Sequence, residues 1–243
     1  HTGNVRESDW LIMGTKLELF ILPFSGSKAS QFDAFCADLE PYIKVNTIEY
    51  AGRGRRAKEP FFTDYGLFMD DICAYINEHR DNSIPYALLG YSIGGFFVYD
   101  LVAKGYVAQP KHLFICACEN NKEEISPISR LPEEEFWDRV IKLGGVDKRL
   151  IERRKFLKLF SRTLRADFNI AEQHRFMSTD KKIDCPVSVL FSETDTPLVN
   201  VQRWQEVCSR QITYYEFSGD HFFILEKHKN VAAVVKKALG MGE

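Results

Sequence analysis

The sequence predicts an α/β fold, with a mostly parallel central sheet and helices on both of its faces. Short apolar runs alternate with stretches of helical periodicity, which is the pattern of strands joined by crossover helices. The chain has 243 residues, 45% hydrophobic and 27% charged, which suits a single domain of ordinary globular composition. One charged segment without strand signals interrupts the alternation, so the sequence also predicts a helical insertion.

Two strands and two helices are predicted near the start of the chain. The apolar run 17–22 ends at a proline and predicts a buried strand. Segment 30–39 has apolar residues at helical spacing and stops before another proline. Residues 45–50 predict the second strand. Asp64 is a suitable N-cap for a helix over 65–79, whose apolar face has one polar exception.

The middle of the chain contains a strand, a turn and a helix in direct succession. The apolar run 85–89 enters a glycine-rich turn, and a helix is predicted over 96–104. Residues 112–118 predict the next strand. From about 119 to 184 the charge rises and strand signals vanish, which predicts a helical insertion over one end of the sheet. Its two helical stretches are 132–143 and 148–176.

The alternation returns after the insertion. The predicted strands cover 186–191 and 212–217, and the predicted helices cover 199–208 and 228–239. Residues 17–243 are therefore expected to form one domain with a lid-like insertion at about 119–184. Residues 1–16 are expected to be an N-terminal extension, in part a vector-derived remnant, because they lack the features of a signal peptide.

The composition argues against several classes of function. A net charge of −2 leaves no strong footprint for nucleic acid. The six cysteines include no CxxC pair and no His/Cys metal spacing, so no metal or other cofactor is expected. Scattered free thiols favour a reducing, cytoplasmic setting. No apolar run of about 18 residues predicts a membrane span, and without a heptad pattern we expect a monomer.

The turn Gly90-Tyr91-Ser92-Ile93-Gly94 carries the main chemical signal. It joins an apolar strand to a helix, as in a nucleophile elbow, where a strained turn lifts the serine clear of the sheet. Glycines two before and two after the serine are needed, because a Cβ there would collide with the neighbouring strand and helix. The N–H of Ile93, at a helix N-terminus, is a natural oxyanion donor. We predict an α/β-hydrolase with Ser92 as nucleophile; the alternative is a glycine-rich connection with an incidental serine.

An acid and then a histidine should follow the serine in this fold. Among the six histidines, His221 follows the last predicted strand, where a loop can carry a base over the carboxyl edge of the sheet. The acid should follow the preceding strand, where Glu193 and Asp195 are candidates and Asp195 is preferred. Its carboxylate would fix the histidine tautomer and stabilise the imidazolium. Asp220 is the runner-up, although immediate neighbours rarely have the geometry to pair.

A second oxyanion donor should come from the loop after the first strand. That loop is Pro23-Phe24-Ser25-Gly26, and the N–H of Ser25 or of Phe24 could point at the oxyanion. On these residues alone, a plain turn that ends the strand is an equal alternative.

Several stretches together resemble one known family. They are LPFSG at 22–26, AGRG at 51–54, LLGYSIGG at 88–95, LPEEEF at 131–136, LGG at 143–145, LRADF at 164–168 and GDHFF at 219–223. On these motifs the chain is similar to type II thioesterases, the stand-alone editing hydrolases that accompany nonribosomal peptide and polyketide synthases. The resemblance runs from about 17 to 239, and the LRADF and HFF stretches distinguish this family from generic α/β-hydrolases.

The resemblance implies roles by position. Ser92 matches the nucleophile, Asp195 the acid and His221 the base, while Ser25 and Ile93 match the backbone donors to the oxyanion. The insertion matches the helical lid that covers the acyl site. The implied reaction removes stalled or misprimed acyl groups from the phosphopantetheine arm of acyl- or peptidyl-carrier domains. Phosphopantetheine then belongs to the substrate, and no cofactor of the enzyme is implied.

Three places depart from the family pattern. Tyr91 stands where histidine is usual, Ser27 and Lys28 stand where the first loop usually has further glycines, and Ala51 stands where proline is usual. None of these changes removes a catalytic group, but they leave the substrate preference open.

Two further questions also have alternatives. The candidate pocket or lid residues, each with ordinary packing as its alternative, are Phe61, Phe62, Phe136, Trp137, Phe156, Phe160 and Phe168. Other functions compatible with the motifs are an acyl-CoA or small-ester hydrolase, a product-releasing thioesterase, and a catalytically idle carrier-binding module.

Overall fold

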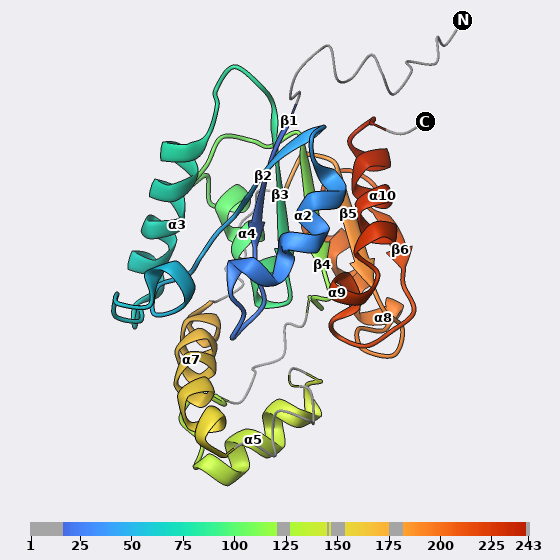
Figure 1. Ribbon diagram of the computed structural model, residues 1–243. Coiled ribbons are helices and arrows are strands. Elements are labelled where there is room, and N and C mark those ends of the chain that lie inside the picture. The colour runs from blue at the N-terminus through green and yellow to red at the C-terminus, as the bar shows by residue number, and fades with distance from the viewer. Residues whose placement is uncertain (1–16, 121–126, 145, 147–153, 175–181, 242–243) are drawn as a thin grey trace, which may run out of the picture.

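A six-stranded sheet forms the centre of the protein in the computed structural model, which describes residues 17–120, 127–144, 146, 154–174 and 182–241. The strand order is β2-β1-β3-β4-β5-β6, and every neighbouring pair is parallel (Figure 1). The strands are β1 (Leu17–Leu22), β2 (Ile43–Thr47), β3 (Tyr86–Tyr91), β4 (His112–Cys116), β5 (Val187–Phe191) and β6 (Thr213–Glu216). The predicted α/β class is confirmed, and the extension predicted at 1–16 lies outside the described residues.

Helices cover both faces of this sheet. The α-helices of the described residues are α2 (Asp33–Leu39), α3 (Tyr65–His79), α4 (Ile93–Ala103), α5 (Glu133–Lys142), α7 (Arg154–Gln173), α8 (Leu198–Val201), α9 (Phe223–Glu226) and α10 (His228–Ala238). Short 3₁₀ helices cover Ala29–Phe32, Gly54–Arg56 and Gln202–Val207. Since parallel strands need a crossover between them, this alternation is what the sheet requires.

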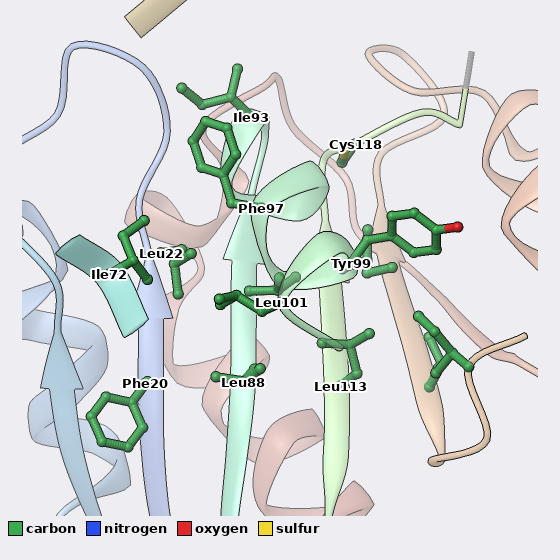
Figure 2. Packing of buried hydrophobic residues seen from close by; sticks show 14 of the residues in the cluster. Phe20, Leu22, Ile72, Leu88, Ile93, Phe97, Tyr99, Leu101, Leu113 and Cys118 are labelled. Atoms are coloured by element: carbon green, nitrogen blue, oxygen red, sulfur yellow. The ribbon is translucent and has the colours of Figure 1, made fainter. Parts of the chain in front are cut away.

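The central strands are mostly apolar because they are buried on both faces, although β1 also contains the buried Glu18, β4 His112 and β5 Ser188. In β1, Phe20 and Leu22 belong to the core beneath α3 and α4, whereas Leu19 and Ile21 belong to the core beneath α2 and α10. Figure 2 shows the first of these cores, where strand residues meet Phe97 and other side chains of α4. Successive side chains of a strand point to opposite faces, so one run of apolar residues supplies both layers.

The direction in which the strands are added to the sheet reverses between β1 and β3. The crossover from β1 leads to β2 on one side, and the later crossovers lead through β3 to β6 on the other. Loops that leave β1 and β3 at their carboxyl ends therefore diverge. Ligands of open α/β sheets bind at such a switch point. The loop 23–26 and the turn at Ser92 both leave the sheet there.

The predicted elements differ from the observed ones mainly at their ends. The helix after Ser92 begins at Ile93, three residues earlier than predicted, although it then contains two glycines that disfavour helix. Packing overrides propensity here, since a Cβ on Gly95 would lie only 2.7 Å from the Cβ of Cys118. The helix predicted at 199–208 divides into α8 and a 3₁₀ helix, and the short helix α9 was not predicted.

The segment between β4 and β5 places α5 and α7 side by side, beyond the carboxyl ends of the strands (Figure 1). They share a small core of their own that contains Phe136, Val140 and Leu164. The amide of Gln173 on α7 accepts a hydrogen bond from the N–H of Tyr65 at 3.1 Å, which ties α7 to α3. Within the described parts of the chain, no helix is long and apolar enough to cross a bilayer.

Candidate active site

Ser92 lies in a strained turn between β3 and α4. Its φ of 55° and ψ of −120° are unusual for a residue with a side chain. A Cβ on Gly90 would overlap the carbonyl group of Gly94, and a Cβ on Gly94 would overlap the carbonyl group of Leu22. Both glycines are therefore required by close backbone approach, as the sequence motif predicts.

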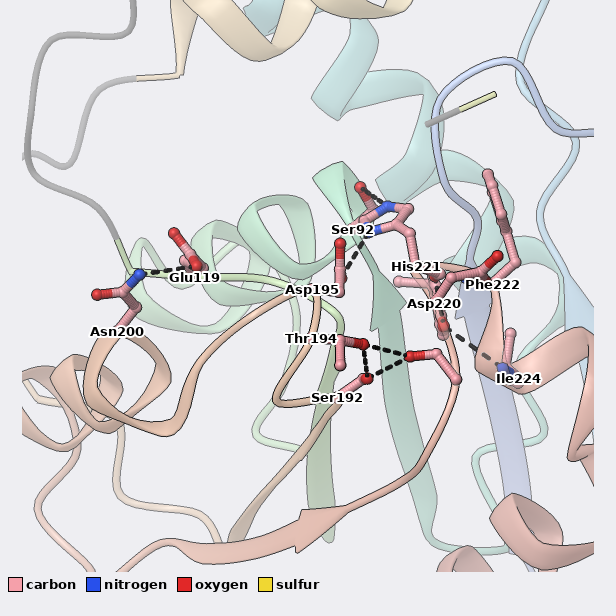
Figure 3. A network of polar contacts seen from close by, with 12 residues as sticks. Ser92, Glu119, Ser192, Thr194, Asp195, Asn200, Asp220, His221, Phe222 and Ile224 are labelled. Carbon is pink, nitrogen blue, oxygen red and sulfur yellow. Dashed lines mark hydrogen bonds and ion pairs between the residues drawn. The ribbon is translucent and has the colours of Figure 1, made fainter. Parts of the chain in front are cut away.

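Three side chains predicted from the sequence meet in one hydrogen-bonded row (Figure 3). The Nε2 atom of His221 lies 3.0 Å from the Oγ atom of Ser92, and its Nδ1 atom lies 2.8 Å from Oδ2 of Asp195. The residues follow β3, β5 and β6 at the same edge of the sheet. If Nδ1 donates to the carboxylate, Nε2 carries a lone pair that can accept the serine proton.

The two other candidate acids are engaged elsewhere. The carboxylate of Glu193 accepts a hydrogen bond from the N–H of Leu198 at 3.0 Å, at the start of α8. The carboxylate of Asp220 accepts one from the N–H of Phe222 at 2.8 Å, within its own turn. Asp195 is therefore the carboxylate that contacts the imidazole.

Tyr91 holds the backbone of His221 in place through a hydrogen bond. Its hydroxyl donates to the backbone carbonyl of His221 at 2.9 Å and accepts from the N–H of Ile224 at 3.4 Å. Burial raises the pKa of Tyr91 well above its usual value, so the hydroxyl stays protonated and able to donate. In the sequence, Tyr91 stands out only as a departure from the family pattern. The signal for its role is a tyrosine in a buried strand, whose hydroxyl needs a partner.

Two hydroxyl groups join the acid loop to the base loop. The Oγ atom of Ser192 and the Oγ1 atom of Thr194 donate to the carbonyl of Gly219, at 2.5 Å and 2.8 Å (Figure 3). This carbonyl lies two residues before His221. The contacts therefore fix the spacing between the loops that carry Asp195 and His221. Sequence reasoning missed them because it does not show which loops face each other.

The turn after β1 is adjacent to the turn at Ser92. The N–H and hydroxyl of Ser27 both donate to the carbonyl of Phe24, at 3.2 Å and 2.5 Å, which closes this turn. The N–H of Gly26 donates to the carboxylate of Asp167 at 2.7 Å. The N–H groups of Ser25 and Ile93 have no hydrogen-bond acceptor among the described residues. Both N–H groups are therefore available to an oxyanion.

The sequence matches the Thioesterase domain family over residues 17–239. The chain belongs to this family. It is 24% identical over 236 residues to the gramicidin S biosynthesis protein GrsT of Aneurinibacillus migulanus, covering 92% of this chain and 89% of GrsT. These findings confirm the family that the motifs predict.

Solved structures show the same fold. The crystal structure of ClbQ, from the colibactin nonribosomal peptide/polyketide synthase pathway, superposes with a TM-score of 0.84 and 23% identity, covering 93% of this chain and 98% of ClbQ. The type II thioesterase BorB, from the borrelidin biosynthetic cluster, gives a TM-score of 0.79 and 22% identity, with 93% of each chain covered. The α/β arrangement of this thioesterase-family protein is thus shared along nearly its whole length.

Gly144, two residues after the end of α5, lies close to Asp195 and His221 of this thioesterase-family site. A Cβ built on Gly144 would lie 3.7 Å from both Oδ1 of Asp195 and Cβ of His221. Gly144 has a φ of +71°, a conformation that glycine adopts without strain. One residue of the insertion, Gly144, therefore lies close to the hydrogen-bonded row of Ser92, His221 and Asp195.

The aromatic pocket candidates have different surroundings. Phe61 and Phe62 line a small pocket between the loop after β2 and α7, together with Arg53, Asp167 and Ile170. Four other candidates belong to the small core of the insertion, and this supports the interpretation that they serve ordinary packing. They are Phe136, Trp137, Phe160 and Phe168. The side chain of Phe156 lies outside the described residues. Among those residues, no group of three His, Cys, Asp or Glu side chains could hold a metal ion.

Proposed function

We propose that the protein hydrolyses acyl groups from the phosphopantetheine arm of acyl- or peptidyl-carrier domains in nonribosomal peptide or polyketide biosynthesis. The observation that carries this proposal is the row of Ser92, His221 and Asp195, within a chain that belongs to the thioesterase family. A serine held against an imidazole, with a carboxylate behind it, is the arrangement that acyl transfer to serine requires.

The proposed reaction has two halves. Nε2 of His221 takes the proton of Ser92 as Oγ attacks the thioester carbonyl, and Asp195 stabilises the imidazolium. The N–H groups of Ser25 and Ile93 hold the oxyanion. The C–S bond then breaks, and the imidazolium proton leaves with the thiol. In the second half His221 deprotonates a water molecule, which attacks the acyl-serine, and Ser92 recovers its proton as the free acid departs.

A thioester suits this site because its leaving group is a good one. A thiolate is a better leaving group than the amine that a protease releases. Its departure therefore depends less on protonation by a general acid. The names of the relatives support the choice of substrate carrier, since GrsT belongs to gramicidin S biosynthesis and BorB is described as a type II thioesterase of a biosynthetic cluster. We propose removal of stalled or misprimed groups as the task and α5 with α7 as the lid over the acyl site.

The direct test measures hydrolysis of a short acyl group loaded on a carrier protein. Wild type and Ser92→Ala are compared by mass spectrometry of the free acid, with the matching acyl-CoA and a simple ester of the same acid as controls. We expect hydrolysis by wild type alone, faster from the carrier than from CoA. Activity on CoA or the ester but not on the carrier would instead favour a small-thioester or ester hydrolase. We further propose that the enzyme acts as a monomer without a cofactor, which native mass spectrometry of the active protein tests.

A further inference from the structure

Asp167 on α7 binds two groups that are far from it in the sequence. Its Oδ2 atom accepts hydrogen bonds from the N–H of Gly26 at 2.7 Å and from Nη1 of Arg53 at 2.5 Å. Its Oδ1 atom accepts from Nη2 of Arg53 at 2.5 Å. The side chains of Arg53 and Asp167 are only 5% and 6% exposed. A carboxylate of the insertion is thus inserted between a buried cation and the turn after β1.

The guanidinium of Arg53 stays charged despite its burial. Burial alone would lower the pKa of the Arg53 guanidinium, but the charge and hydrogen bonds of Asp167 outweigh it and raise the pKa. The guanidinium carbon lies 5.4 Å from the ring of Tyr50 and 6.0 Å from the ring of Phe61. Tyr50 in turn donates a hydrogen bond to the carbonyl of Pro23 at 3.0 Å. Arg53 is therefore fixed by the body of the protein, and it holds Asp167 in one place.

The turn after β1 also packs directly on α7. A Cβ on Gly26 would come within 2.7 Å of the ring of Phe160 and 2.8 Å of the side chain of Leu164. Gly26 has a φ of +77° and follows Ser25 directly. Ser27 closes the turn by donating to the carbonyl of Phe24. The hydrogen bond from the Gly26 N–H to Asp167 fixes the turn at a second point. Together the two contacts leave the backbone at Ser25 little conformational freedom.

We propose that Asp167, held by Arg53, is a positioning residue for the oxyanion turn. The inference rests on the proposed function in one respect, because it takes the Ser25 N–H as an oxyanion donor. Asp167 does not touch the reacting atoms. It holds the N–H of Gly26 so that the preceding N–H stays aimed while charge develops on the substrate oxygen, where preorganised donors have their largest effect. The insertion then completes the catalytic site as well as covering it.

The decisive variant removes the acceptor without leaving a lone buried charge. Asp167→Ala would leave Arg53 uncompensated and could unfold the protein, whereas replacing a buried ion pair by apolar residues is often tolerated. We therefore choose the double variant Arg53→Met/Asp167→Leu. On a short acyl thioester of N-acetylcysteamine we expect kcat to fall about 30-fold with KM changed less than about threefold, because displacement of an oxyanion donor acts on the transition state. A boronic acid that forms a tetrahedral adduct on Ser92 should lose affinity by a similar factor.

Two single variants complete the set. Asp167→Asn keeps an oxygen for the Gly26 N–H, so we expect a smaller loss in kcat, about fivefold. Glu172→Gln is the matched control on the same helix. The carboxylate of Glu172 accepts hydrogen bonds from the N–H groups of Ile128 and Ser129, which lie outside the oxyanion turn. Its kcat should stay within about twofold of wild type.

The outcomes separate this inference from the proposed function. If Ser92→Ala hydrolyses the thioester as wild type does, the proposed function fails. If Ser92→Ala is inactive but the folded double variant keeps the wild-type kcat and boronate affinity, only the role of Asp167 is overturned. The same conclusion follows if the double variant raises KM alone, or if Glu172→Gln loses as much kcat as the double variant does.

Discussion

Three carboxylate–imidazole pairs occur among the described residues, and two of them have similar geometry and different surroundings. Nδ1 of His221 lies 2.8 Å from Asp195, and Nδ1 of His174 lies 3.0 Å from Asp100. The side chains of the first pair are 13% and 12% exposed, whereas those of the second are 3% and 0% exposed. The first pair sits on loops at the carboxyl edge of the sheet, and the second joins α4 to the residue that follows α7.

We infer from this difference that such a pair is not by itself a catalytic signature. The imidazole of His221 presents its second nitrogen to Ser92, on a strained turn at the edge of the sheet. The carboxylate of Asp100 instead accepts further hydrogen bonds from Tyr65 at 2.6 Å and Lys104 at 2.5 Å. That second pair ties three helices together, and we infer a structural role for it. The predictions below test this division between a reactive pair and a structural pair.

The largest effect should come from the serine of the reactive pair. Ser92→Ala removes the nucleophile, so we expect kcat for a short acyl thioester to fall by about 10⁵-fold. The thermal midpoint should stay close to that of wild type, because Oγ contributes little packing. Steady-state hydrolysis and circular dichroism melts measure the two quantities. A variant with more than about a tenth of the wild-type kcat would contradict the assignment of Ser92.

The next effect should come from the acid of the same pair. Asp195→Asn keeps the shape of the side chain but favours the wrong imidazole tautomer, so we expect kcat to fall about 10³-fold. The matched control is Glu193→Gln, whose carboxylate contacts Leu198 instead of the imidazole. That variant should keep kcat within about twofold. Equal losses in the two variants would show that Asp195 is not the acid.

The structural pair should show the opposite pattern. Asp100→Asn removes the negative charge that Tyr65, Lys104 and His174 contact. Because these groups would then lack a charged acceptor, we expect the free energy of unfolding to fall by about 3 kcal/mol. In the protein that remains folded, kcat should change by less than about twofold. Urea titration and hydrolysis assays at 25 °C make the comparison. A 100-fold loss of kcat without loss of stability would place this pair in the catalytic machinery.

The same carboxylate should contribute to the pH dependence of stability. Burial alone would raise the pKa of Asp100, but its hydrogen bonds to His174, Lys104 and Tyr65 outweigh burial and lower the pKa from its ordinary value of 3.8. A group with a lowered folded pKa stabilises the protein above its unfolded pKa and loses that contribution as the pH falls through the folded pKa. Urea midpoints measured between neutral pH and pH 3 should therefore fall less steeply in Asp100→Asn. An acid limb as steep as that of wild type would contradict this.

Among the residues that contact the reactive pair, Tyr91 should have the smallest effect on kcat, through the backbone of His221. Tyr91→Phe removes the hydrogen bond to the His221 carbonyl, so we expect a loss of about 1 kcal/mol in stability and a fall in kcat of about fivefold. KM should change little, because the hydroxyl contacts the backbone carbonyl of His221 and the N–H of Ile224. Hydrolysis kinetics of the purified variant measure both constants. A change in KM alone would indicate that Tyr91 acts on substrate binding.

The sequence by itself determined the class of fold and the family. Largely apolar runs such as 17–22 and 186–191 have the length and continuity of strands buried on both faces, and that local pattern survives in the structure as β1 and β5. The glycine spacing around Ser92 can also be read from the local strand–turn–helix pattern, although the backbone that excludes a Cβ at Gly94 belongs to Leu22 of β1. The order of serine, acid and histidine along the chain likewise needed no coordinates.

Only the tertiary structure decided which groups meet across distant segments. The contact between Gly26 and Asp167 spans 141 residues, and the contact between Tyr91 and His221 spans 130. Neither leaves a periodic signal, since a hydrogen bond between two loops depends on where the sheet and the insertion bring those loops. The choice of Asp195 over Glu193 as the partner of His221 has the same origin, because both carboxylates follow β5 and only the direction of the loop separates them. Local sequence fixes dihedral preferences and buried faces, whereas the packing of whole layers fixes which polar groups become neighbours.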